Sequence, residues 1–164
     1  MSQQHTITAL VQNEAGTINR LVSMFRRRGI SLASFNAGDC EQEGYSRLTL
    51  MVNGDETMLY QTVRQLNKLI DVVEVEDLRS EHGIHRELAL IRVDAKADER
   101  KQVERIVSEF DGKIPRATES SVFVELTGDA GDIEKLISAL KPYNVSEVVR
   151  TGVVAIRTDS VPSA

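Results

Sequence analysis

One order of strand and helix patterns occurs twice in this chain, and the repeat constrains its fold more than any other feature. Each half reads β-α-β-β-α-β, and the second copy begins about eighty residues after the first. This order is typical of the ferredoxin-like unit, in which two helices pack on one face of a four-stranded antiparallel sheet. We therefore predict an α+β protein of two ferredoxin-like βαββαβ units, residues 1–80 and 81–164. The strand patterns cover residues 5–12, 30–39, 47–52 and 72–78, and then 88–93, 113–118, 122–127 and 145–156.

Four amphipathic helices are expected between these strands, because apolar residues recur there at the spacing of a helix face. The first should end at about Arg28, where Gly29 suits the left-handed position after a helix. The second should begin at Asp55, a typical N-cap residue. The expected buried stripes are Ile18, Leu21, Val22 and Phe25, then Leu59, Val63, Leu66 and Ile70, then Val103, Ile106, Val107 and Phe110, and finally Ile133, Leu136, Ile137 and Leu140.

The helices of such a unit leave one face of the sheet and its edge strands uncovered. The two units are expected to be joined by a polar, glycine-containing linker at residues 79–84. We expect the open faces to remain available for association, and the strand at residues 31–39 to be an edge that pairs with its copy in a homodimer.

Charge and composition exclude several classes of protein. The net charge is −5, whereas a general nucleic-acid binder needs a basic surface that displaces phosphate counterions. No apolar run approaches the roughly 18 residues of a membrane span. The single cysteine excludes an internal disulfide and is compatible with a reducing cytoplasm. We expect a cytoplasmic protein that binds neither nucleic acid nor membranes.

No set of residues in the sequence points to catalysis. Cys40 lies among carboxylates, which disfavour a thiolate nucleophile. His82 and His85 stand three residues apart, but further metal ligands are not found near them in the sequence. The sequence motifs of the common serine hydrolases, zinc peptidases and P-loop enzymes are absent. We therefore expect neither a catalytic residue nor a metal site in this chain.

Two other uses of the ferredoxin-like fold also lack their residues. RNA-binding members stack bases on aromatic residues of the central strands, but the first strand here offers Thr6, Thr8 and Leu10. Acylphosphatase members clamp phosphate with an arginine in the first strand–helix loop. This chain has Gln12-Asn13-Glu14-Ala15-Gly16 in that loop, with an acid where the arginine would be needed. Neither activity is therefore expected.

The turn between the first strand and the first helix is the strongest candidate for a binding site. Asn13 offers a carbonyl and an amide, and the N–H groups around Ala15 and Gly16 lie at the positive end of a helix. These groups suit a small zwitterion, with its carboxylate on the N–H groups and its ammonium on an oxygen. An ordinary Asx turn with a helix cap would use the same residues, so the turn alone leaves both interpretations open. Because the turn is expected to be exposed, substitution of Gly16 should cost the fold little.

Longer stretches of the chain resemble one family. The turn at residues 11–16, followed by a helix, resembles the ligand turn of an ACT domain. The stretches GDETMLYQTVRQLNKLIDVVEV (54–75), HRELALIRV (85–93) and VRTGVVAI (149–156) resemble the small regulatory subunit of acetolactate (acetohydroxyacid) synthase. The order and spacing of these stretches match throughout the chain. The resemblance implies that the first unit is an ACT domain.

The resemblance also implies a function and a set of site residues. It implies a non-catalytic subunit that activates a thiamine-diphosphate enzyme of branched-chain amino-acid synthesis and lets valine inhibit that enzyme. No cofactor is expected in this chain, whereas thiamine diphosphate, magnesium and FAD are expected in the large catalytic subunit. Valine is expected at the interface of two N-terminal ACT domains in a homodimer. Matched to the family pattern, the ligand residues are Asn13, Ala15, Gly16, Ser31, Ala37 and Gly38.

Ser31 departs from the family pattern, which commonly has an asparagine that reaches across the dimer at this position. Serine is shorter, so ligand affinity, ligand identity and feedback sensitivity are left open. The alternative function is a free-standing double ACT protein that senses an amino acid and acts on another enzyme or regulator. Recovery of a thiamine-diphosphate enzyme together with the chain would distinguish the two.

Overall fold

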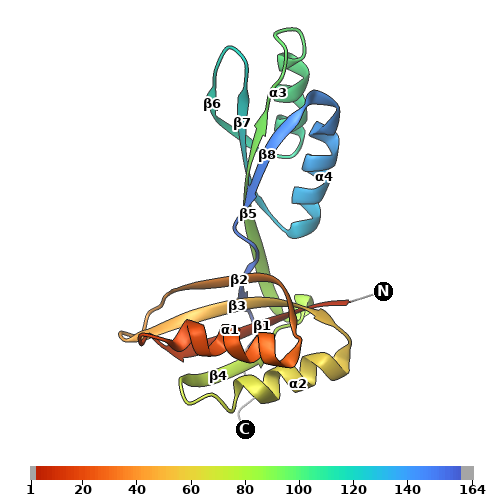
Figure 1. Ribbon diagram of the computed structural model, residues 1–164. Coiled ribbons are helices and arrows are strands. Elements are labelled where there is room, and N and C mark those ends of the chain that lie inside the picture. Colours follow the sequence, from red (N-terminus) through yellow and green to blue (C-terminus); the bar gives the residue numbers. More distant parts are fainter. Residues whose placement is uncertain (1–2, 160–164) are drawn as a thin grey trace. The chain divides into compact units, whose positions relative to one another are not determined.

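The computed structural model describes residues 3–159, which form two units, each with its own sheet and core (Figure 1). Within the described chain, the first unit contains residues 3–85 and 153–159, and the second contains Arg86–Gly152. The sequence patterns placed the division after residue 80 and kept the whole C-terminal stretch in the second unit. The division by contacts instead falls within strand β5 (Gly83–Val93), and the chain returns to the first unit after Gly152.

The first unit is a four-stranded antiparallel sheet with two helices on one face (Figure 1). The strand order is β2-β3-β1-β4, so β1 is central and β2 and β4 are the edges. The predicted ferredoxin-like order is confirmed, and β2 is the edge strand that the sequence predicted. The elements are β1 (Gln3–Gln12), α1 (Thr17–Arg28), β2 (Ser31–Asp39), β3 (Tyr45–Gly54), α2 (Glu56–Leu66) and β4 (Val72–Asp77).

Helix α1 begins and ends at glycines in the left-handed region. Gly16 precedes the helix with φ +92° and Gly29 follows it with φ +64°. The N–H group of Gly29 donates to the carbonyl of Arg26 at 3.2 Å, which is the predicted C-terminal arrangement. Arg26, Arg27 and Arg28 form the last turn, where cations compensate the negative end of the helix dipole.

The buried face of α1 differs in part from the prediction. Leu21 and Phe25 are buried as expected, but Ile18 and Val22 are 41% and 48% exposed. Thr17 and Met24 are buried in their place. Both sets follow helical spacing, and packing of α1 on the sheet buries the second set. Periodicity alone could not choose between them because the two stripes are adjacent on one helix.

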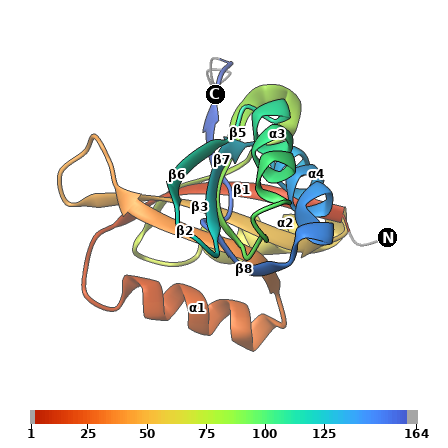
Figure 2. The same ribbon diagram turned by 90° about the horizontal axis from the view of Figure 1, so that it is seen from above.

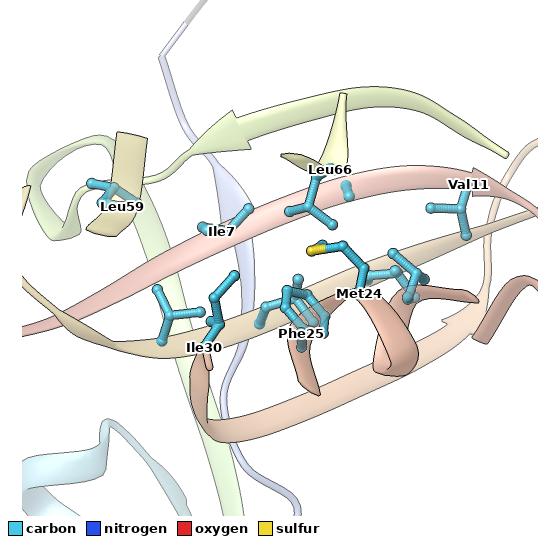
Figure 3. Packing of buried hydrophobic residues seen from close by; sticks show 12 residues of the cluster. Ile7, Val11, Met24, Phe25, Ile30, Leu59 and Leu66 are labelled. Atoms are coloured by element: carbon cyan, nitrogen blue, oxygen red, sulfur yellow. The ribbon is translucent and has the colours of Figure 1, made fainter. Parts of the chain in front are cut away.

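The core of the first unit lies between the sheet and the two helices. In Figure 3, Ile7 and Val11 of β1 lie among Met24 and Phe25 of α1 and Leu66 of α2. All five are at most 4% exposed. Burial of a large apolar side chain stabilises a fold by about 1.5–3 kcal/mol, so this cluster anchors both helices to β1.

Helix α2 begins as predicted and ends earlier than predicted. The carboxylate of Asp55 accepts a hydrogen bond from the N–H group of Met58 at 2.8 Å, which confirms Asp55 as the N-cap. The helix ends at Leu66. Ile70 therefore lies beyond the helix and is 88% exposed, so its predicted place in the buried stripe was wrong.

The face of the first sheet opposite the helices is partly covered by the C-terminal segment, residues 153–157. Strand β9 (Val154–Arg157) pairs with β5. The N–H group of Ala155 donates to the hydroxyl of Thr49 at 3.4 Å. The guanidinium of Arg157 donates to the carboxylate of Glu76 at 3.0 Å. The expectation that this whole face stays available was therefore wrong.

The predicted strand at residues 145–156 is two strands. β8 (Val145–Arg150) belongs to the second unit, and β9 follows after a bend that includes Gly152 at φ +76°. The predicted linker at residues 79–84 is also structured. It contains a 3₁₀ turn at Ser80–His82 and the first residues of β5.

The second unit repeats the architecture of the first. Its sheet has the order β6-β7-β5-β8, and its two helices cover one face (Figures 1 and 2). A buried ion pair joins β5 to β8. Glu87 is 4% exposed, and Arg150 donates to both of its carboxylate oxygens at 2.8 and 2.9 Å.

Among residues 3–159, no helix combines the length and the apolar character that crossing a bilayer requires. The further elements are α3 (Arg100–Glu109), β6 (Lys113–Ala117), β7 (Val122–Gly128) and α4 (Ala130–Leu140).

Candidate ligand-binding site

In the part of the chain that the structure describes, the turn between β1 and α1 exposes backbone N–H groups without a hydrogen-bond acceptor, at the start of a twelve-residue helix. Its backbone is held at both ends. The N–H group of Asn13 donates to the carbonyl of Gly44 at 2.8 Å, and that of Thr17 donates to Glu14 at 3.2 Å. Within the described chain, the N–H groups of Ala15 and Gly16 have no acceptor. The turn can therefore offer two hydrogen-bond donors to an anionic group. These donors lie at the N-terminal end of α1, where the helix dipole favours a negative charge.

The turn is not an Asx-capped helix start. Gly16 occupies the N-cap position of α1, and the helix has no side-chain cap. The side-chain amide of Asn13 instead donates to the carboxylate of Asp39 at 3.4 Å. An Asx turn with a helix cap would have explained Asn13 without a ligand, but this cap does not form.

The sheet register brings part of β2 to the turn. The last residues of β1 and the last residues of β2 meet opposite sides of β3, since Val11 and Asp39 both pair with Ser46. Ala37 and Gly38 precede Asp39 directly and are exposed. Five of the six predicted ligand residues thus lie at one end of the sheet, namely Asn13, Ala15, Gly16, Ala37 and Gly38.

Ser31 lies at the other end of the same sheet. It pairs with Asn53 at the far end of β3 and is seven residues from Gly38 along β2. A strand rises about 3.3 Å per residue, so the two positions are about 23 Å apart. Within one chain Ser31 therefore does not belong to the cluster at the turn.

Arg20 lies near the turn and was not among the residues predicted from the sequence. Its guanidinium forms an ion pair with the carboxylate of Asp71, and this hydrogen bond raises the pKa of Arg20 above its ordinary value. A Cβ atom placed on Gly16 would lie 3.1 Å from the Nη1 atom of Arg20. The arginine therefore reaches back over the turn from the first turn of α1. The available signal was spacing, because residue i+4 on a helix lies above residue i.

Gly16 is more constrained than its exposure predicts. A φ of +92° is unfavourable for residues that have a Cβ atom, and a side chain there would also press on Arg20. The expectation that substitution of Gly16 costs the fold little was therefore wrong.

The hairpin beside the turn is held by its own ion pair. Arg47 donates to the carboxylate of Glu41, and this hydrogen bond lowers the pKa of Glu41 to about 2. Cys40, in the same hairpin, donates weakly to the carbonyl of Gln42 at 3.5 Å.

His82 lies 3.0 Å from the carboxylate of Asp159. In the described part of the chain, His, Cys, Asp and Glu residues form no group of three or more suited to a metal ion.

Two family models match the chain, one over each half. The model described as the AHAS small subunit-like ACT domain matches residues 7–74, and the model described as the small subunit of acetolactate synthase matches residues 86–159. The first unit is therefore an ACT domain. The matched range includes residues 11–16, the turn that resembles the ligand turn of such domains.

Individual relatives match the chain over nearly its whole length. A probable acetolactate synthase small subunit from Archaeoglobus fulgidus is 36% identical over 153 residues, which cover 93% of this chain and 96% of the relative. The acetolactate synthase small subunit of Mycobacterium bovis is 37% identical over 152 residues, covering 93% and 90%. The crystal structure of the small subunit from Thermotoga maritima has a TM-score of 0.88 at 33% identity, covering 97% and 99%.

The fold and the first unit thus define an ACT-domain protein with two ferredoxin-like units. More specifically, the chain belongs to the family of acetolactate synthase small subunits. The family predicted from the sequence is confirmed.

Proposed function

We propose that this chain is a non-catalytic regulatory subunit that activates the thiamine-diphosphate catalytic subunit of acetolactate synthase and makes it sensitive to valine. The observation that carries the proposal is the pair of N–H groups at Ala15 and Gly16, which have no acceptor within residues 3–159 and lie beside exposed small residues of β2. Membership of the small-subunit family supports a catalytic large subunit as the partner. Thiamine diphosphate, magnesium and FAD are proposed to belong to that partner and not to this chain.

In this proposal valine binds as a zwitterion at the β1–α1 turn. Its carboxylate accepts hydrogen bonds from the N–H groups of Ala15 and Gly16, near the positive end of α1. Its ammonium donates to an oxygen of Asn13 or Asp39, two side chains that lie within 3.4 Å of each other. The small side chains at the end of β2 leave room for the branched apolar group.

A second copy of the chain is proposed to complete the site through the free edge of β2. Ser31 and Asp39 are each four residues from Phe35. An antiparallel pairing of β2 with its copy, centred on Phe35, would therefore bring Ser31 of the partner subunit opposite Asp39. This pairing would return Ser31 to the ligand turn from which it is distant within one chain. It would also satisfy the hydrogen-bonding groups of an exposed edge strand.

A site shared by two copies gives valine a means of regulation. A regulatory ligand must bind one assembly state better than another, and a difference of about 1–3 kcal/mol suffices. A ligand at the β2–β2 interface would bind the paired state better than the separated chains. The catalytic subunit would then respond to the geometry of the paired ACT domains.

The test is reconstitution with the large subunit. The purified chain alone should form no acetolactate, and mixing should raise the turnover of the large subunit. Titration with valine, leucine and isoleucine should then inhibit the complex, with valine the most effective. Acetolactate formed by the chain alone, or turnover that is unchanged on mixing, would overturn the proposal. Recovery of a different enzyme with the chain would favour a free-standing amino-acid sensor.

A further inference from the structure

One buried residue holds both flanks of the ligand turn. The backbone carbonyl of Asp71 accepts a hydrogen bond from the N–H group of Gln12 at 2.8 Å, on the strand side of the turn. Its carboxylate accepts from the guanidinium of Arg20, on the helix side. Asp71 is 4% exposed and lies between α2 and β4. The four residues from Asn13 to Gly16 thus lie between two residues, Gln12 and Arg20, that are both hydrogen-bonded to Asp71.

The guanidinium of Arg20 is held by Asp71 through one nitrogen atom and faces the β1–α1 turn with a different nitrogen atom. Its Nε atom donates to Asp71, and its Nη2 atom makes a weak contact of 3.4 Å with the hydroxyl of Thr17. Its Nη1 atom lies 3.1 Å from the position a Cβ atom would take on Gly16. Across residues 3–159, Nη1 has no hydrogen-bond acceptor of its own. A cationic donor is therefore available beside the free N–H groups.

We infer that Arg20, held by Asp71, is a positioning residue that fixes the β1–α1 turn and makes it select a ligand carboxylate over a neutral group. This inference rests on the proposed valine site. The buried carboxylate of Asp71 fixes where the guanidinium lies, so its orientation is set before the ligand binds. Asp71 and Glu14 both offset part of the arginine's charge. Nη1 is the guanidinium atom nearest the Cβ position of Gly16 and points the remaining positive charge at the turn.

A purely structural role for Arg20 predicts a different result. Arg20 could act only by bracing α1 against Asp71, since the pair joins residues 51 positions apart. Loss of that brace would lower stability and weaken every ligand of the turn by the same factor. A role in selection predicts that ligands with and without a carboxylate respond differently.

The test compares valine with valinamide, which keeps the ammonium and the side chain but has a neutral amide in place of the carboxylate. Calorimetric titration of the full chain should show that the unmodified protein prefers valine. In Arg20→Gln that preference should fall about tenfold, mostly through weaker valine binding. Arg27→Gln is the matched control, because Arg27 is an exposed arginine on the same helix away from the turn. It should leave the preference unchanged.

A second variant keeps the test decisive if Arg20→Gln folds poorly. Arg20→Lys keeps the positive charge but lacks the planar fork, so it should lower the melting temperature while keeping most of the preference for valine. Equal weakening of valine and valinamide in folded Arg20→Gln would overturn the inference and leave the valine site intact. Failure of the unmodified protein to bind valine would instead overturn the proposed function, and this inference with it.

Discussion

The side-chain amide of Asn36 donates a hydrogen bond to the backbone carbonyl of Val153 at 3.0 Å. Asn36 lies on β2, next to the predicted ligand residue Ala37. Val153 directly follows the bend at Gly152, where the chain returns to the first unit. Strand β2, which is proposed to bind ligand and to pair with its copy, is thus hydrogen-bonded to the segment at residues 153–157. Although distant in sequence, this segment belongs physically to the ACT unit.

Removal of the chain after Gly152 should therefore destabilise the ACT unit. The shortened chain loses the burial of Val153, which is 7% exposed, and the hydrogen bonds of residues 153–157 to β2, β3 and β4. The expected cost is about 2–4 kcal/mol. Thermal unfolding followed by circular dichroism measures it.

A chain that ends after Asp159 is the control, because it keeps β9. An unchanged melting temperature for the chain that ends at Gly152 would show that β9 contributes nothing to the first unit. For the same reason, a fragment that ends near Ser80 lacks part of the first unit.

Gly16→Asp should abolish inhibition by valine while activation of the large subunit persists. The new carboxylate would repel the ligand carboxylate and would attract Arg20 away from Asp71. The variant should also lose about 1 kcal/mol of stability, because φ at this position is +92°. Valine inhibition and activation curves for the reconstituted complex check this.

The matched control is Gly29→Asp. Gly29 also has a positive φ, of +64°, but lies at the other end of α1 with open space around it. It should cost comparable stability and leave valine inhibition normal. If both variants keep normal inhibition, the ligand is not held by the β1–α1 turn.

The sequence predicted the elements of the fold well, because the signals it used are local. Alternation in β1, the N-cap at Asp55 and the glycine at the end of α1 depend on neighbouring residues alone. The face that α1 buries was predicted only in part, since Ile18 and Met24 both fit a helical stripe and tertiary packing decides between them. The return of the chain after Gly152 was missed because a glycine signals a bend but not its destination.

The predicted ligand residues come from two separate stretches of the chain, and five of the six lie at one end of the first sheet. Asn13 to Gly16 form one turn, and the structure brings Ala37 and Gly38 to the same end of the sheet. The ion pair between Asp71 and Arg20 could not be predicted from the sequence, because the two residues are 51 positions apart. Binding of valine at this cluster stays a prediction.

Replacement of Arg47 by glutamine should raise the pKa of Glu41. In the folded chain the hydrogen bond from Arg47 lowers that pKa from 4.5 to about 2. A lowered pKa in the folded state contributes stability above about pH 4.5, and this contribution is lost as pH falls from 4.5 toward 2. Both side chains are exposed, so solvent screening keeps the effect on stability small.

Carboxyl NMR titration measures the pKa directly. In Arg47→Gln the pKa of the Glu41 carboxylate should rise above its value in the unmodified protein, while the backbone hydrogen bond to Glu41 still lowers it. Arg64→Gln is a suitable control, because Arg64 lies on α2, where its guanidinium stacks on Tyr60. Titration of Glu41 near its ordinary value in the unmodified protein would contradict the ion pair.

Ser31→Asn should strengthen inhibition by valine. Asparagine is longer than serine and would extend an amide from one copy toward the ligand turn of the other, as in the family pattern. One added hydrogen bond of about 1 kcal/mol would lower the inhibition midpoint roughly fivefold. Ser31→Ala should raise the midpoint or leave it unchanged. A midpoint in Ser31→Asn equal to that of the unmodified protein would argue that residue 31 does not reach the ligand.

Charge at residue 31 should control dimer formation, if β2 pairs with its copy around Phe35. That register sets residue 31 of each copy opposite Asp39 of the other, so any new charge acts twice by symmetry. Ser31→Asp would place like charges opposite each other, and Ser31→Lys would place opposite charges there. Each cross-strand pair contributes about 0.2–1 kcal/mol, so the dimer dissociation constant should rise in the first variant and fall in the second, by up to roughly thirtyfold.

Sedimentation equilibrium without valine measures these constants at low ionic strength, and the difference between the two variants should shrink in 1 M salt, where the Debye length is about 3 Å. Phe35 itself packs against the core, so its substitution would not report on the edge alone. Substitution at residue 31 avoids this, because Ser31 is exposed. If both variants shift the dissociation constant in the same direction, residue 31 does not face Asp39 and the pairing register is different.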